Sequence, residues 1–227
     1  MPANATRRNR SMPRSRFALV PGLLATALFI SVSTVEAFTR PAFDLTRHAI
    51  SMLSLGDRGW VMAANFVITG ILVVVLAMGL ARERAGRPAG PTLIALFGAG
   101  LILAGFFPAP AGLGFPQGTP HDLEPVMTTT AIVHAIAFNL AFSALIAATF
   151  VFGYAYGRER KRVWQTMSIA TGAALPTLIF SGMAVLIPTG VAFYAAATLA
   201  WLWLAAITLE HMRQVRVPAK RRPRATV

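Results

Sequence analysis

The residues whose types could support chemistry gather in one stretch, RHAISMLSLGDRGW, at residues 47–60. It contains His48, Ser51 and Asp57, the residue types of a hydrolase in which a base activates a nucleophile within hydrogen-bond reach. His134, in a later apolar segment, is a further candidate for the catalytic base. The sequence has neither a Gly-x-Ser-x-Gly elbow nor a His-Glu-x-x-His motif, two patterns that position such groups in hydrolases. Spacing alone therefore does not establish that these candidates converge.

The same stretch shows the spacing of a short helix lying in the plane of the lipid headgroups. Asp44 or Thr46 could cap this helix and Gly56 could end it, with apolar residues on one side and polar residues on the other. In one interpretation the polar side holds a lipid phosphate, with Arg as the charge partner and Ser as the hydrogen-bond donor. In the alternative it is a solvated segment without a specific ligand. The polar stripe consists of Arg47, Ser51, Ser54 and Arg58.

A second group of ionisable residues, His121, Asp122 and Glu124, belongs to a segment rich in Gly and Pro. Imidazole and carboxylate groups are zinc ligands, but residues adjacent in a chain rarely chelate one ion. We therefore expect no cofactor, with a divalent metal as the alternative. The chain has no Cys, which excludes disulfides and thiolate metal sites. The candidate metal ligands are His48, His121, Asp122 and His134.

A third set of polar residues lies within apolar segments. TTTAIVHAIAFNLAFSAL places Thr130 and His134 four residues apart on one helical face, and Asn139 follows between one and two turns later. Polar side chains inside a membrane either mark functional sites or bind neighbouring helices. Asn65 and Glu36 are expected at a similar depth. The candidate contacts to a lipid or other ligand are therefore Asn65, Thr130, His134 and Asn139, together with the polar stripe.

Six long apolar segments must position these side chains. The mean hydropathy of the 227-residue chain is +0.61 and only 13% of its residues are charged, about half the share found in soluble domains. A helix of about 20 apolar residues crosses the hydrocarbon, where the backbone must satisfy its own hydrogen bonds. The predicted fold is therefore all-α: a polytopic membrane protein with a six-transmembrane-helix bundle. The segments are Phe17–Phe38, Trp60–Ala81, Pro91–Phe107, Thr128–Tyr156, Gln165–Ile187 and Gly190–Leu209.

The net charge of +13 is distributed unequally between the two sides that six spans create. One side carries 18 Lys and Arg residues and the other carries three. Cytoplasmic segments collect Lys and Arg, so the N- and C-termini are predicted to be cytoplasmic. This distribution explains the charge as a topology signal, and we expect no nucleic-acid partner. The basic side comprises residues 1–16, 82–90, 157–164 and 210–227, and the other comprises the outer loops 39–59 and 108–127.

The predicted organisation is a transmembrane domain at residues 17–209 between two basic cytoplasmic tails, at 1–16 and 210–227. Disorder is expected over residues 1–16 and 213–227. Membrane lipids are the expected partners; the sequence does not indicate a protein partner. Of the 21 basic residues 19 are Arg, a composition typical of GC-rich bacteria, so we expect a bacterial plasma (inner) membrane. The first span, with VEA before Phe38, has features of a secretory signal, but its length favours retention.

Parts of the sequence resemble a bacterial six-span family, domain of unknown function 998. RHAISMLSLGDRGWVMAANFVITGILVVVLAMGL resembles the opening of that family, GLILAGFFPAP its third helix and AIVHAIAFNLAF its fourth. The chain departs from the family where HDLEP stands instead of a His-Gly pair, so His121 is not matched. The resemblance covers residues 17–209 and implies a six-helix bundle without implying an activity. The residues that carry it are His48, Ser51, Leu55, Gly56, Gly59, Trp60, Asn65, Gly70, Gly105–Pro108 and His134.

Three functions are compatible with these patterns. The first is a non-catalytic membrane protein that binds a lipid or small apolar molecule in an outward-facing cavity, or that assists a membrane partner. The second is a membrane-embedded hydrolase that acts on lipid with His, Asp and Ser at the outer face. A small transporter comes third, because no charged residue is expected deep in a span.

Overall fold

The structure is a computed structural model that describes residues 16–83 and 86–215. The predicted N-terminal tail lies outside the described residues except for Arg16. The described chain consists of helices and loops. Its elements are η1 (Arg16–Leu19), α1 (Val20–Thr39), η2 (Ile50–Ser54), α2 (Gly59–Glu83), α3 (Ala89–Phe106), α4 (Thr129–Arg158), α5 (Arg162–Met183) and α6 (Thr189–Val215).

All six α-helices are long and apolar enough to cross a membrane, which confirms the predicted six-helix bundle of a multi-pass membrane protein. Differences from the predicted bounds are confined to helix ends. The fifth helix stops at Met183, four residues before the predicted Ile187; residues 184–185 form a turn and residues 186–187 a bend. The sixth continues to Val215, six residues into the segment predicted as a tail.

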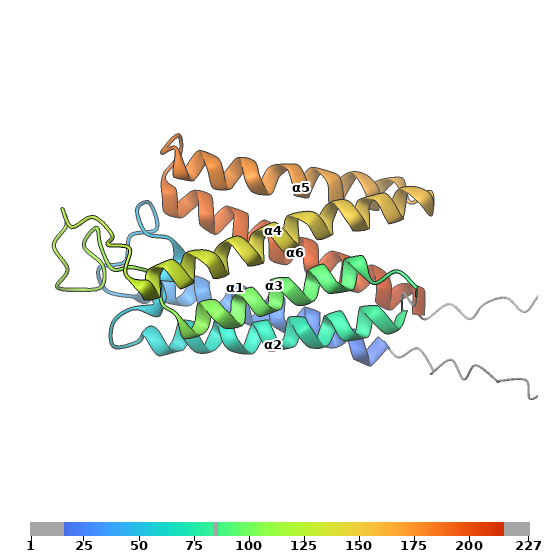
Figure 1. Ribbon diagram of the computed structural model, residues 1–227, viewed down its shortest axis with the longest axis horizontal. Helices are drawn as coiled ribbons and strands as arrows, with labels where there is room; N and C mark the ends of the chain where they lie inside the picture. The colour runs from blue at the N-terminus through green and yellow to red at the C-terminus, as the bar shows by residue number, and fades with distance from the viewer. Residues whose placement is uncertain (1–15, 84–85, 216–227) are drawn as a thin grey trace, which may run out of the picture.

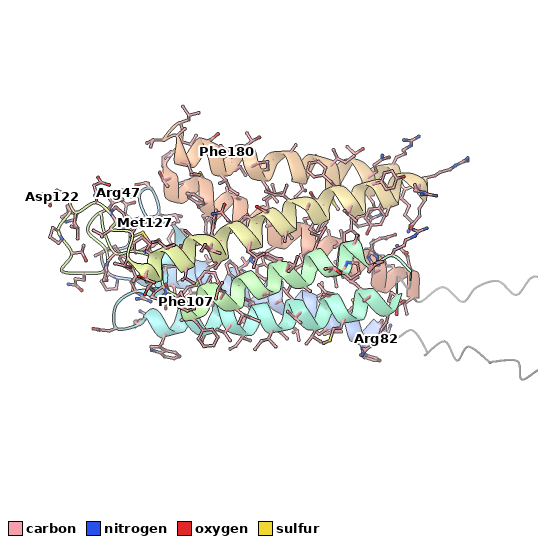
Figure 2. All side chains as sticks on the ribbon, in the orientation of Figure 1. Arg47, Arg82, Phe107, Asp122, Met127 and Phe180 are labelled. Carbon is pink, nitrogen blue, oxygen red and sulfur yellow. The ribbon has the colours of Figure 1, made fainter. Side chains whose placement is uncertain are left out.

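The helices lie lengthwise beside one another and alternate in direction (Figure 1). One end of the bundle, here called the loop end, carries the connections 40–58, 107–128 and 184–188. The opposite end, the terminal end, carries the start of η1, the end of α6 and the short α2–α3 and α4–α5 connections. Figure 2 places Arg47 and Asp122 at the loop end and Arg82 at the terminal end.

Helix α3 approaches α2 and α4 closely because glycines face each contact. A Cβ atom on Gly98 would lie 2.7 Å from the carbonyl oxygen of Gly70, and a Cβ on Gly70 would lie 2.7 Å from that of Gly98. On the other side of α3, a Cβ on Gly100 would lie 2.8 Å from the carbonyl oxygen of Ala137. Small residues let helix backbones pack at close range, which favours association in lipid. The α2–α3–α4 side of the bundle is thus tightly packed.

Charged side chains lie at the two ends of the bundle. At the terminal end, the Lys161 ammonium lies 3.0 Å from a Glu210 carboxylate oxygen and 3.3 Å from one of Glu159. Arg87 lies 3.5 Å from Glu159. These ion pairs connect the α4–α5 turn to α6 and to the start of α3. The apolar middle of the bundle is compatible with a bilayer core.

We predict that Gly98→Val destabilises the bundle by about 2–3 kcal/mol, the upper part of the range for overpacking, because its Cβ would press against the Gly70 backbone. Ala99→Val is the control, since Ala99 is the next residue of α3 and is exposed. Thermal unfolding of both variants in detergent checks this. Equal melting temperatures would contradict the close contact between α2 and α3.

Candidate functional site

A cavity of about 490 Å³ lies inside the bundle toward the loop end. This volume falls in the range of small-molecule sites. All six α-helices and η2 contribute to its lining, as do residues 109–110 and 125 of the second long loop. The lining is apolar or aromatic apart from Ser51, His134 and Asn139.

The floor of the cavity is an aromatic cluster contributed by four different helices. The Trp201 ring of α6 stacks on Phe29 of α1 with centroids 4.7 Å apart, and Phe97 of α3 lies 5.5 Å from Trp201. Phe66 of α2 meets Phe29 edge-on at 5.7 Å. Such aromatic pairs stabilise packing beyond the area that they bury. The floor is therefore fixed by rigid rings.

The side of the cavity lies between α4 and the α5–α6 pair. Figure 1 shows α4 close to α5 at the terminal end and farther from it toward the loop end. Phe138 of α4 contacts Phe193 of α6 with ring centroids 5.6 Å apart. Phe180, labelled on α5 in Figure 2, and Met183 line the cavity and are 66% and 63% exposed. Since both are on a membrane-spanning helix, this side is directed toward lipid.

Three polar residues line the cavity. His134 is buried, and its Nδ1 lies 2.7 Å from the carbonyl oxygen of Phe107. Asn139 lies one to two turns deeper in α4 and donates from Nδ2 to the carbonyl of Ala135 at 2.8 Å. Ser51 belongs to η2. These three come from the predicted set, and the structure brings them to one cavity.

Helix η2 closes the cavity at the loop end. Ile50, Met52 and Leu53 are buried, and Ile50, Ser51 and Met52 line the cavity. The predicted headgroup-plane helix from Asp44 or Thr46 to Gly56 was wrong: residues 45–47 form a turn and only five residues are helical. The apolar side chains of this segment are drawn into the bundle, so it packs as a roof.

The predicted polar stripe does not form one surface. Arg47 lies before η2, is exposed and donates to the carbonyl of His121 at 3.3 Å. Ser54 donates to the carbonyl of Ser51 at 2.7 Å. Arg58 lies after η2 and is directed to Glu36. Each of these three side chains therefore makes a hydrogen bond within the protein.

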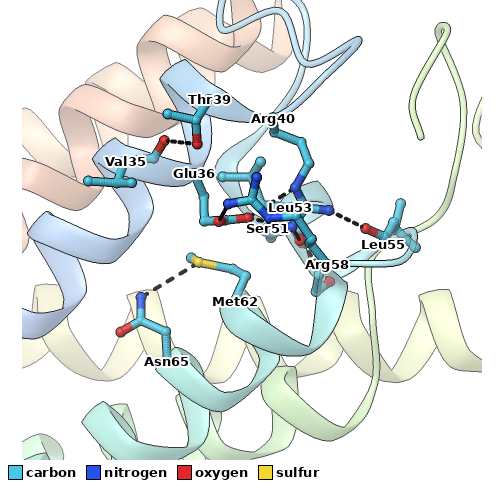
Figure 3. Close-up of polar contacts among 11 residues, drawn as sticks. Val35, Glu36, Thr39, Arg40, Ser51, Leu53, Leu55, Arg58, Met62 and Asn65 are labelled. Atoms are coloured by element: carbon cyan, nitrogen blue, oxygen red, sulfur yellow. Dashed lines mark hydrogen bonds and ion pairs between the residues drawn. The ribbon is translucent and has the colours of Figure 1, made fainter. Parts of the chain in front are cut away.

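A buried carboxylate holds the roof in place (Figure 3). Glu36, at the loop end of α1, accepts from Arg40 Nε at 3.0 Å and from Arg40 Nη2 at 2.5 Å. Arg58, beside the start of α2, also donates to Glu36. Arg40 then donates to the carbonyls of Leu53 and Leu55 at 3.0 and 2.8 Å. This Glu36 network joins α1, the roof and α2.

His48 connects the two long loops. Its Nδ1 accepts from the backbone N–H of Asp44 at 2.9 Å, so Nε2 carries the proton and donates to the carbonyl of Leu113 at 3.0 Å. The ring also packs against Phe43 and the buried Phe115. Both nitrogens are thus engaged by the backbone, which leaves neither available as a base or a metal ligand in this arrangement.

The turn before His48 depends on an ionised Asp44. The hydroxyl and backbone N–H of Thr46 donate to Asp44 Oδ1 at 2.7 and 2.8 Å and hold the pKa of that carboxyl below its ordinary value. A depressed folded-state pKa contributes stability that is present above the unfolded-state pKa and lost as pH falls through the folded-state value. The turn should therefore loosen only below about pH 4.

The other predicted residues lie apart from the cavity. Asp57, His121, Asp122 and Thr130 are exposed, the first three in the loops and the last in the first turn of α4. Within residues 16–83 and 86–215, no group of three or more His, Asp or Glu side chains is placed to hold a metal ion. The structure does not gather the predicted metal ligands into a cluster.

Asn65 is buried in α2 behind the aromatic floor. Its Nδ2 lies 3.5 Å from the carbonyl oxygen of Phe29 and 3.6 Å from the sulfur of Met62. Its Oδ1 has no hydrogen-bond partner among the described residues. Asn65 thus contacts α1, and it is not among the residues that line the cavity.

The comparison with known families agrees with this architecture. Residues 23–210 match the family model described as a protein of unknown function, DUF998. The chain belongs to this family. No curated protein and no solved structure matches the chain. The DUF998 match includes all or most of each of the six membrane-spanning helices, and no activity follows from it.

Sequence reasoning missed much of the cavity in this DUF998 protein. The aromatic floor and the contributions of α5 and α6 come from residues that look like ordinary membrane-span residues in the sequence. Arg40 was likewise missed, although its spacing of four from Glu36 was a visible signal for an ion pair on one helix.

We predict that Glu36→Gln lowers the free energy of unfolding by about 3–5 kcal/mol, because it leaves the buried Arg40 guanidinium without a counter-charge. The side chain of Glu36 is 3% exposed, whereas that of Arg58 is 48% exposed. Arg58→Gln should therefore cost about 1 kcal/mol or less.

Asp57→Asn makes the same chemical change at an exposed carboxylate and serves as the control. Chemical or thermal unfolding in detergent measures all three variants. If Glu36→Gln proves no more destabilising than Asp57→Asn, the network does not hold the loop end together.

Proposed function

We propose that this protein is a non-catalytic multi-pass protein of the bacterial plasma membrane that binds a lipid or small apolar molecule in its cavity. The observation that carries the proposal is the cavity itself: about 490 Å³, with an apolar lining and three polar residues. Sites for small molecules combine an apolar lining with a few polar groups that orient the ligand.

The exposed side of the cavity supports direct exchange with the bilayer. Phe180 and Met183 belong both to the lining and to the exposed surface of α5. A ligand dissolved in the membrane could pass between α4 and α5 without crossing water. Membrane lipids are therefore the natural source of the ligand, whether the protein acts alone or assists a membrane partner.

The distribution of charge supports an outward orientation of the loop end. By the topology that six spans predict, residues 1–16, 82–90, 157–164 and 210–227 share one side and carry 18 of the 21 Lys and Arg residues and three of the eight acidic residues, a net charge of +15. The remaining three basic and five acidic residues give −2 at the loop end. Cytoplasmic segments are the basic ones, so we place both termini in the cytoplasm and the cavity near the outer leaflet.

The hydrolase alternative lacks a supporting contact. A hydrolase needs a base within hydrogen-bond reach of its nucleophile. Ser51 and His134 both line the cavity, but no hydrogen bond joins them among the described side chains. His48 is engaged at both nitrogens. The geometry therefore favours binding over hydrolysis, and no observation favours the transporter.

We predict that Ala135→Phe weakens ligand binding about tenfold, equivalent to about 1.4 kcal/mol, because its ring would occupy the cavity from α4. Ala135 lines the cavity, whereas Ala173 of α5 is exposed and does not. Ala173→Phe is therefore the matched control. Binding is measured as quenching of tryptophan fluorescence by a lipid with brominated chains.

Quenching is measured with and without the substitution Trp201→Phe. The difference between the two is the signal from Trp201 in the cavity floor. Wild-type protein and Ala173→Phe should show this signal and Ala135→Phe should lose most of it. Equal signals from all three, or no Trp201 signal in the wild type, would count against a lipid site in the cavity.

A further inference from the structure

The polar groups of the cavity are uncharged, although three arginines lie at the same end of the bundle. Arg40 and Arg58 are both directed to Glu36, and Arg47 reaches the carbonyl of His121. None of the three is among the lining residues. A phosphate or carboxylate in the cavity would thus find no positive partner, and burying an unpaired charge is strongly unfavourable.

His134 presents a hydrogen-bond acceptor to the cavity. The Phe107 carbonyl can only accept, so the proton of the ring lies on Nδ1, 2.7 Å away. In a neutral imidazole the other nitrogen, Nε2, is then an acceptor. His134 is 7% exposed and lines the cavity. The backbone carbonyls of Phe107 and Ala104 both interact with its ring, and the one hydrogen bond of good geometry joins Nδ1 to Phe107. Nε2 is not among the fully buried side-chain atoms that lack a partner, so it keeps accessible surface that a donor on a ligand can reach.

The position of the polar residues orients a ligand. Ser51 belongs to the roof and His134 lies near the loop-end start of α4, whereas the aromatic floor is formed by rings of α1, α2, α3 and α6. A molecule with one polar end would therefore place that end toward the loop end and its apolar chain over the rings. A hydroxyl group fits this end because it can donate to an imidazole nitrogen and accept from Ser51.

We propose that the cavity binds a neutral lipid that ends in a hydroxyl group, and that this hydroxyl donates to His134 Nε2. The proposal rests on the proposed lipid-binding function and specifies its ligand class. Long-chain alcohols, isoprenoid alcohols and diacylglycerol share this chemistry. Phospholipids and fatty acids do not, because their charged groups have no partner in the lining.

The test compares a brominated long-chain alcohol with its O-methyl ether, which has nearly the same shape but cannot donate. Quenching of Trp201 in the purified full chain measures both affinities, with Trp201→Phe as the blank. The wild type should bind the alcohol about tenfold more tightly than the ether. His134→Asn should remove this difference, because the shorter amide can still donate to Phe107 but offers no acceptor at the Nε2 position.

His121→Asn is the matched control, since His121 is exposed in the second loop, and it should keep the tenfold difference. Equal binding of alcohol and ether by the wild type would overturn the hydroxyl proposal and leave the lipid site standing. Binding of neither would overturn the proposed function. A preference that survives in His134→Asn would overturn the role of His134. The comparison of the two ligands needs no variant, so it decides the proposal even if His134→Asn does not fold.

Competition identifies the source of the hydroxyl. Unlabelled diacylglycerol and an unlabelled isoprenoid alcohol are each titrated against the brominated alcohol, with phosphatidic acid as the anionic control. Displacement by either neutral lipid at lower concentration than phosphatidic acid supports the proposal and names the source. More effective displacement by phosphatidic acid would overturn it.

Discussion

The carboxylate of Glu36 is buried at the loop end of α1, and a buried charge is tolerated only when partners neutralise it. Arg40 and Arg58 do so. Arg40 is also fixed by the carbonyls of Leu53 and Leu55, so the pair determines where η2 lies. Buried ion pairs contribute little net stability, and in some proteins they select one arrangement over others. Here the selected arrangement is a roof whose apolar residues face inward, and without it the cavity would be open at the loop end.

The cavity also depends on uneven packing within the bundle. Glycines bring α3 against α2 and α4, so the backbones of these helices leave no space between them at the glycine contacts. Between α4 and α6 the side chains are large instead, and Phe138 meets Phe193 across the gap. Large aromatic rings between two helices keep their backbones apart, whereas glycines allow the backbones to approach. The lining combines both kinds of residue, since Gly100 and Phe97 belong to the same helix.

The global fold was predictable because a membrane imposes simple rules of length and hydropathy, and all six spans were found within a few residues. The local structure of the first outer loop was not. Helical spacing in residues 44–56 suggested a continuous amphipathic helix, but Arg40 takes the carbonyls of Leu53 and Leu55, and Asp44 forms a turn with Thr46. The convergence of Ser51, His134 and Asn139 depends on tertiary packing between η2 and α4. The spacing of residues along the sequence does not predict such packing. The amino-acid composition of the spans also does not show which Phe residues line the cavity and which face the lipid.

The two buried histidines of the loop end show how backbone carbonyls assign different roles to one residue type. His48 is saturated, accepting from Asp44 and donating to Leu113, and it acts as a cross-link between loops. The ring of His134 interacts with the carbonyls of Phe107 and Ala104, but its one hydrogen bond of good geometry uses Nδ1, so Nε2 remains for the cavity. The arginines that could have attracted a phosphate are turned to Glu36 or to a backbone carbonyl. The ion pair that builds the roof therefore also keeps positive charge out of the cavity, so the structural constraint and the preference for a neutral ligand have the same physical origin.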